Sequence, residues 1–157
     1  MKKYIIIAPH ADDEIIGCHQ TFLTNVVETV IFGTPEAVEE AKLASQVLGY
    51  ERKCFQNNEI TFEKEYVYLF PDPTYELHPI HRQMGMLGEK ILRDGFDVIF
   101  YNTNMTAPYI FEVPSPAIKR DKLNMLYPLK KALWEFEHKY FLFEGYVQWK
   151  MLINRHE

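Results

Sequence analysis

One short segment near the N-terminus gathers side chains that bind metals and move protons. His10 stands directly before the acids Asp12, Asp13 and Glu14 in the sequence Pro-His-Ala-Asp-Asp-Glu. Acids so close together repel one another unless they share a positive partner, and a divalent metal is the simplest one. An imidazole nitrogen with carboxylate oxygens suits zinc or ferrous iron. The alternative is an ordinary helix start, where acids favour the helix dipole. A histidine before two aspartates is not part of that pattern.

A second group of candidate ligands lies near the middle of the chain. His78 and His81 belong to the sequence His-Pro-Ile-His-Arg. At a spacing of three, both rings fall on one side of a helical turn, so one can bind a metal while the other faces a substrate. Taken alone, the pair is equally consistent with two surface histidines. The two groups gain meaning only if the fold brings them together.

The hydrophobic pattern predicts a fold that does so. Residues 4–8 are a continuous apolar run rich in isoleucine, typical of a strand buried on both faces. Further strands are expected at 27–32, 53–56, 66–70, 97–101 and 109–113, and helices at 13–25, 35–48, 79–93 and 119–143, the last broken at Pro128. Alternating strands and helices indicate an α/β domain with a mostly parallel sheet flanked by helices. Both candidate groups follow strands, and ligands bind at the carboxyl ends of such strands.

Length, composition and charge narrow the function. The 157 residues, 47% hydrophobic and 25% charged, are typical of one globular domain. The net charge of −5 and the lack of a basic stripe argue against binding nucleic acid. No apolar run approaches the ~20 residues of a membrane span. The two cysteines, Cys18 and Cys54, form no CxxC pair and fit a reducing cytoplasm. No GxGxxG follows the first strand, which argues against a nucleotide-binding Rossmann domain.

Two motifs carry a resemblance to a known family. Residues 4–21, YIIIAPHADDEIIGCHQT, resemble the first motif of the PIG-L (LmbE-like) deacetylases, PHPDDE followed by a Gly-rich stretch, and residues 78–82, HPIHR, resemble their second motif, HPDHR. Residues 34–49, 122–127 and Glu144 are similar more loosely, so the resemblance touches most of the chain. It implies one Rossmann-like domain over residues 1–157. It also implies an enzyme that removes acetyl groups from N-acetyl sugars, mostly N-acetylglucosamine conjugates.

The resemblance also implies roles for individual residues. His10, Asp13 and His81 would be three ligands of one divalent metal, zinc or alternatively iron, with an open position for water. Asp12 would be the general base that takes a proton from the metal-bound water. His78 would stabilise the oxyanion or protonate the leaving amine. Glu14 is expected to hold the loop or cap the helix.

Some positions depart from the family pattern. Ala11 replaces a proline of the first motif, and Ile80 replaces the aspartate of the second. Losing a carboxylate that orients a ligating histidine can cost roughly 10–100-fold in affinity or activity. Ile80 and the shortened loops therefore favour an alternative, a non-catalytic relative that binds a sugar or nucleotide ligand, whereas the intact Asp12 argues against it. Short loops also leave room for a lid from a neighbouring subunit, so a homo-oligomer stays open.

Residues outside the motifs carry structural expectations. Tyr75, Tyr101, Tyr109 and Phe111 could line a wall that stacks on a sugar, although a core or sheet position is expected for each one singly. Trp134 and Trp149 are expected to anchor packing. The run of residues 119–122, Lys-Arg-Asp-Lys, is expected to form a solvated face.

Overall fold

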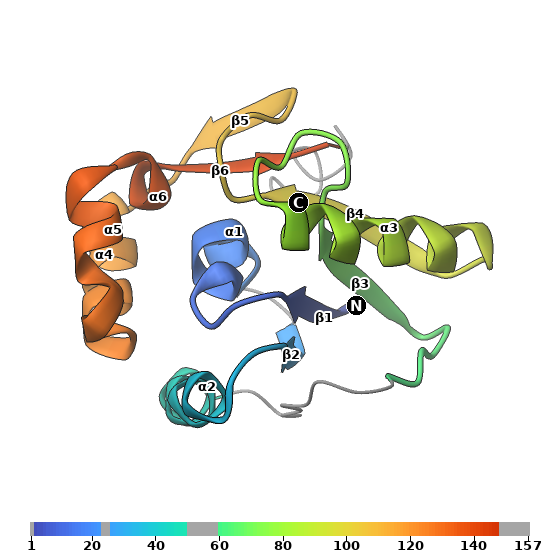
Figure 1. Cartoon of the computed structure of the whole chain (residues 1–157), viewed down its shortest axis with the longest axis horizontal. Coiled ribbons are helices and arrows are strands. Elements are labelled where there is room, and N and C mark those ends of the chain that lie inside the picture. The colour runs from blue at the N-terminus through green and yellow to red at the C-terminus, as the bar shows by residue number, and fades with distance from the viewer. Residues whose placement is uncertain (1, 23–25, 50–59, 148–157) are drawn as a thin grey trace.

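The fold is built around one β-sheet (Figure 1). The structure is a computed structural model, which describes residues 2–22, 26–49 and 60–147. Its described strands are β1 (Lys3–Ala8), β2 (Val26–Ile31), β3 (Tyr66–Pro71), β4 (Asp97–Asn102), β5 (Tyr109–Glu112) and β6 (Phe143–Tyr146), in the order β2-β1-β3-β4-β6-β5. The first four run parallel, whereas β6 is antiparallel to both β4 and β5. The chain is therefore a single α/β domain of Rossmann-like architecture, as predicted.

Helices cover both faces of this sheet. They are α1 (Asp13–Phe22), α2 (Pro35–Leu48), α3 (Pro79–Arg93), α4 (Pro116–Leu126), the 3-10 turn η1 (Pro128–Lys130), α5 (Lys131–Phe136) and α6 (Lys139–Leu142). Figure 1 shows α3 on one side, and α1, α2, α4 and α5 on the other. None of the described helices is long and apolar enough to cross a membrane.

Alternation along β1 explains how one strand serves two layers. Ile5 and Ile7 pack with Ile91 of α3, whereas Ala8 packs with Ile15 and other residues of the opposite layer. Successive side chains of a strand point to opposite faces, so a strand covered on both sides must be apolar throughout. The consequence is that α1 and α3 pack on opposite faces of neighbouring strands.

The strand order reverses beside β1. The chain leaves β1 through α1 to reach β2 on one side, then returns through α2 to place β3 on the other side. The carboxyl ends of β1 and β3 are therefore adjacent at a topological switch point, where open α/β sheets bind ligands. The residues that follow these two strands are the two predicted motifs.

Local signals account for most of the helix boundaries. The Thr34 side chain accepts a hydrogen bond from the Ala37 amide, Pro35 is the first residue of α2, and Gly49 ends it with a φ of 74°. The predicted break at Pro128 is confirmed. The predicted helical region ends within one residue of its expected end, at Leu142, and residues 143–146 form β6, a strand that the sequence did not predict. The expected strand at 53–56 and Trp149 lie outside the described residues.

The predicted solvated face at 119–122 is wrong for Lys119, which is fully buried. Its Nζ donates to the carbonyl of Ile16 at 2.7 Å and lies 3.3 Å from a carboxylate oxygen of Glu144. Leu123 and Leu126 follow it at spacings of four and seven, on the buried face of α4. Helical periodicity therefore places Lys119 inside the protein, where Glu144 compensates its charge.

The predicted aromatic residues are largely structural. Tyr101 is fully buried and donates its hydroxyl to the carbonyl of Ile7 at 2.7 Å, so it belongs to the core and not to a sugar-stacking wall. Phe111 stacks on Tyr146 with ring centroids 5.8 Å apart, at a sheet position. Trp134 is buried as expected. Tyr75 and Tyr109 remain partly exposed.

Candidate metal centre

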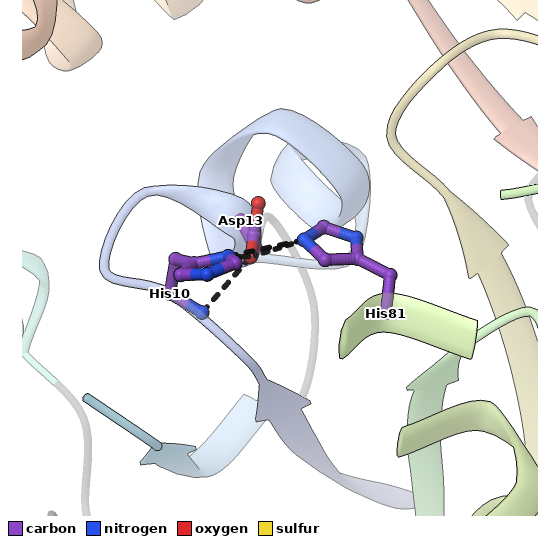
Figure 2. Close-up of side chains that lie close together, drawn as sticks. All are labelled: His10, Asp13 and His81. Carbon is purple, nitrogen blue, oxygen red and sulfur yellow. Dashed lines mark hydrogen bonds and ion pairs between the residues drawn. The ribbon is translucent and has the colours of Figure 1, made fainter. Parts of the chain in front are cut away.

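Three of the predicted ligands converge at the switch point. Figure 2 shows His10 and Asp13, from the loop after β1 and the start of α1, pointing toward His81 on the first turn of α3. His10 Nδ1 lies 3.2 Å from Asp13 Oδ2 and 3.1 Å from His81 Nε2. His81 Nε2 lies 3.2 Å from the same Asp13 oxygen. Residues far apart in the chain therefore present three ligand atoms to one point.

The spacing of these atoms fits a metal ion. Zinc binds imidazole nitrogens and carboxylate oxygens at about 2.0–2.2 Å, so two ligands of a tetrahedral ion lie about 3.3 Å apart. The three observed separations, 3.1–3.2 Å, are close to this value and to one another. Asp13 and His81 are buried, while the His10 side chain is 38% exposed. The residues fit a three-ligand centre that is reached from the His10 side.

The loop after β1 holds its shape through its own hydrogen bonds. Asp12 has a φ of 120°, which a residue other than glycine rarely adopts and which costs roughly 1–3 kcal/mol. Its carbonyl caps α1 by accepting the amides of Ile15 and Ile16 at 3.0 and 2.9 Å. Its amide donates to Glu14 Oε2 at 2.9 Å. Glu14 therefore holds the loop, as predicted, and Asp12 is placed directly beside the candidate ligand Asp13.

The second motif is built into the start of α3. The His78 ring caps this helix, since its Nδ1 accepts the Ile80 amide at 3.1 Å, and Pro79 is the first helical residue. Gly85 allows the helix to approach the end of β3 closely, because a Cβ there would lie 2.6 Å from the carbonyl oxygen of Pro71. This close packing brings His81 to the candidate metal site.

A buried carboxylate orients His81, although the second motif lacks its aspartate. Glu76 Oε1 lies 3.2 Å from His81 Nδ1, and it also accepts the amide and hydroxyl of Thr103 at 2.8 and 2.9 Å. With its proton on Nδ1, the ring presents Nε2 to a metal. Ile80 itself is 46% exposed. The expected loss of the orienting carboxylate is wrong, because Glu76 supplies it from the preceding loop.

The loop that carries Glu76 is held by a second buried acid. Asp72 Oδ1 accepts the amides of Thr74, Tyr75 and Glu76, and its Oδ2 accepts the Asn102 side chain at 2.6 Å. Asn102 ends β4, so Asp72 ties the loops after β3 and β4 together. These ties fix Glu76, which in turn fixes His81.

Burial and nearby charges shift the pKa values of the acids of the site in different directions. Burial raises the pKa of Asp12 well above its ordinary value, with a further contribution from the adjacent Asp13 charge. Burial acts in the same direction on Asp13, but hydrogen bonds from His10 and His81 hold its pKa well below the usual range. Burial also raises the pKa of Glu14, to about 7. Asp13 is therefore ionised, as a metal ligand must be, while Asp12 and Glu14 are the carboxyls with raised proton affinity.

The pKa values of two histidines of the site, His81 and His78, are also shifted in opposite directions. Burial disfavours the charged form of His81, but its hydrogen bonds to Asp13 and Glu76 overcome this and raise its pKa to about 10. Burial and the charges of His81 and His10 lower the pKa of His78. Without a metal, His81 is the cation of the site, so a metal must displace its proton.

Two supporting residues come from the C-terminal helices. Tyr127 donates its hydroxyl to Glu14 Oε1, and Lys130 Nζ donates to the carbonyl of Ala11. Lys130 Nζ also lies 3.7 Å from Asp12 Oδ2. Sequence reasoning missed Lys130, Glu76 and Asp72. One sequence signal could have indicated Glu76 and Asp72, since both acids lie between a predicted strand and a histidine motif. No such signal lies near Lys130.

Comparison with known proteins adds no assignment. No protein-family model matches the chain, and a search of curated proteins finds no significant relative. The fold and the His10–Asp13–His81 geometry therefore carry the functional argument.

Proposed function

We propose that the protein is a metal-dependent hydrolase that cleaves an N-acetyl amide of a sugar or related conjugate, as the resemblance to PIG-L (LmbE-like) deacetylases implies. The observation that carries the proposal is the convergence of His10, Asp13 and His81 at 3.1–3.2 Å, with Asp12 adjacent. The reaction adds water to the acetyl carbonyl carbon and breaks the C–N bond, giving acetate and a free amine. A divalent ion supplies a Lewis acid that activates water when bound.

Asp12 is the general base of this proposal. Its buried carboxyl has a raised pKa, which suits a group that takes a proton from the attacking water near neutral pH. Asp13 cannot share this role, because hydrogen bonds from two histidines hold it ionised and oriented. The two neighbouring aspartates thus divide ligand and base functions.

His78 donates a hydrogen bond in this proposal. Its Nδ1 accepts the Ile80 amide, so in the neutral ring the proton is on Nε2. Its ring centroid lies 5.1 Å from those of both His10 and His81, so it borders the site. A neutral Nε2–H suits stabilisation of the oxyanion that forms at the acetyl carbonyl. The cap bond favours this role over protonation of the leaving amine.

The alternative, a non-catalytic domain that binds a sugar or nucleotide ligand, loses its main support. It relied on the shortened loops and on Ile80 having replaced the orienting carboxylate, and Glu76 provides that carboxylate. A domain that only binds a ligand also has no need of a buried base beside its metal ligands. Turnover by the wild-type protein distinguishes the two functions directly.

The test combines metal content with acetate release. Wild-type protein, purified without a His-tag or added metal, is expected to carry about one zinc or iron per chain, and His81→Ala is expected to lose it. Wild-type protein is then screened against N-acetylglucosamine and its glycosides for acetate, with Asp12→Asn as the variant that binds metal but does not turn over. A protein that takes up no metal on titration would overturn the proposal. Metal binding without acetate release would also overturn it and would favour the alternative, a non-catalytic domain that binds a ligand.

A further inference from the structure

A break in the C-terminal helices directs two side chains at the loop after β1. Pro128 follows the end of α4 and begins η1, so the chain changes direction there. On the two sides of the break, Tyr127 reaches Glu14 with its hydroxyl, and Lys130 reaches the Ala11 carbonyl with its ammonium group. The contacts join positions more than a hundred residues apart in the sequence.

These contacts hold one peptide group by both of its polar atoms. In the peptide between Ala11 and Asp12, the N–H donates to Glu14 Oε2 at 2.9 Å and the carbonyl accepts from Lys130. The peptide is trans, so the two atoms point in opposite directions and the two bonds together fix its plane. The bond from Lys130 involves a charged ammonium group, which makes it stronger than a bond between neutral groups.

This peptide needs such restraint. It leads into Asp12, whose φ of 120° persists only where the surroundings impose it. It also lies between His10 and Asp13, so its rotation would separate two of the three ligand atoms. Contacts that hold this peptide in place therefore also keep the His10 and Asp13 ligand atoms together.

Lys130 also brings charge to the loop. Its Nζ lies 3.7 Å from Asp12 Oδ2. The next residue, Lys131, instead pairs with Glu135 at 3.1 Å on the exposed side of α5. The two adjacent lysines thus differ in whether they contact the loop, and Lys131 is a matched control.

We propose that Lys130 is a positioning residue of the metal centre, which keeps the Ala11–Asp12 peptide in the orientation that aligns His10 with Asp13. It acts through the loop, because its ammonium group contacts the Ala11 carbonyl and Asp12 and none of the three ligand atoms of His10, Asp13 and His81. The inference rests on the proposed function only in requiring the metal centre. It does not depend on activity toward an acetylated substrate.

The experiment measures metal binding in variants at this position. Zn²⁺ affinity is determined by competition with a chromogenic chelator, and the visible spectrum of the Co²⁺-loaded protein reports ligand geometry. Lys130→Met is expected to lower the affinity roughly 10–100-fold, as the loss of groups behind metal ligands commonly does, and to change the Co²⁺ spectrum. Lys130→Arg should restore most of the affinity, and Lys131→Met should bind as the wild type does. If Lys130→Met fails to fold, Lys130→Gln, which keeps a donor without the charge, takes its place.

The outcomes separate the two proposals. Wild-type affinity and an unchanged Co²⁺ spectrum in Lys130→Met would overturn the positioning role and leave the proposed hydrolase intact. A loss that Lys131→Met reproduces would also overturn it, because the effect would then be general to α5. Metal binding that depends on Lys130 in a protein that releases no acetate would support the positioning role while the deacetylase proposal fails. A wild-type protein that binds neither Zn²⁺ nor Co²⁺ would overturn both.

Discussion

The two strand–helix units that build the site differ in how they are held. The unit of β3 and α3 is regular: its helix has a side-chain cap from His78, and its loop is tied by Asp72 and Glu76 to residues about 30 positions away. The unit of β1 and α1 enters its helix through a positive φ at Asp12. Its helix is interrupted at Cys18, which has a φ of −132°. Tyr127 and Lys130 support it from the far end of the chain.

Two buried histidines show the same contrast. His81 lies in the first turn of α3 with a carboxylate at each ring nitrogen, whereas both ring nitrogens of His19, near the end of α1, lack a hydrogen-bond partner among the described residues. A buried polar group without a partner costs free energy. We infer that the β3–α3 unit forms a rigid platform and that the β1–α1 unit is the strained half, which distant contacts complete.

The strongest test of this contrast removes the acid that holds the platform. Asp72→Ala should destabilise the protein by roughly 3–5 kcal/mol, because buried and half-buried donors lose their common acceptor. The free energy of unfolding is measured in urea. Asp121→Ala, at an exposed carboxyl of α4, is the control and should change stability by less than about 0.5 kcal/mol. A small effect at Asp72 would mean that the loop after β3 is not the rigid half.

The pH dependence of stability tests the strained half. Burial, with the charges of Lys122 and Lys119, lowers the pKa of His19 to about 4. The unfolded chain binds a proton there below about pH 6.5, so between these values the unfolded state holds more protons. Stability should therefore fall as the pH falls from about 6.5 to 4, by up to about 3 kcal/mol.

His19→Leu isolates this effect from the other titrating groups. Urea unfolding between pH 4 and 7 should show a flatter loss of stability in His19→Leu than in the wild type. His138→Leu, at an exposed histidine before α6, should retain the wild-type slope. Equal slopes in the wild type and His19→Leu would show that the His19 environment does not disfavour protonation.

The sequence predicted the parts of the site that depend on local order. His10 and Asp13 follow an apolar strand directly, and His81 lies in the first turn of a helix with a clear N-terminal signal. Because parallel strands end at one edge, the two motifs had to meet there. Strand and helix periods place these residues without knowledge of any distant contact.

The supporting residues could not be predicted in the same way. Nothing around Lys130 indicates that it reaches Ala11, since that contact depends on how α4 packs against α1 and how η1 turns back from α4. Lys119 misled the prediction because a charged residue is ordinarily exposed, and its partner Glu144 lies on a strand that the sequence did not predict. Glu76 lay close to the second motif but off its pattern. Residues that act through tertiary contacts leave little local trace.

The smallest expected effect compares the two units within the metal centre itself. Glu76→Gln keeps the shape of the side chain but removes the charge that faces His81 Nδ1, so Zn²⁺ affinity should fall roughly 10-fold, with Glu76→Ala nearer 100-fold. Glu65→Gln, at an exposed acid before β3, should bind as the wild type does. If the β3–α3 unit is the rigid platform, Glu76→Gln should weaken binding without altering the Co²⁺ spectrum, because Asp72 and Thr103 still hold the loop. A spectrum that changes as much as in Lys130→Met would show that His81 is no better fixed than His10, and the contrast between the two units would fail.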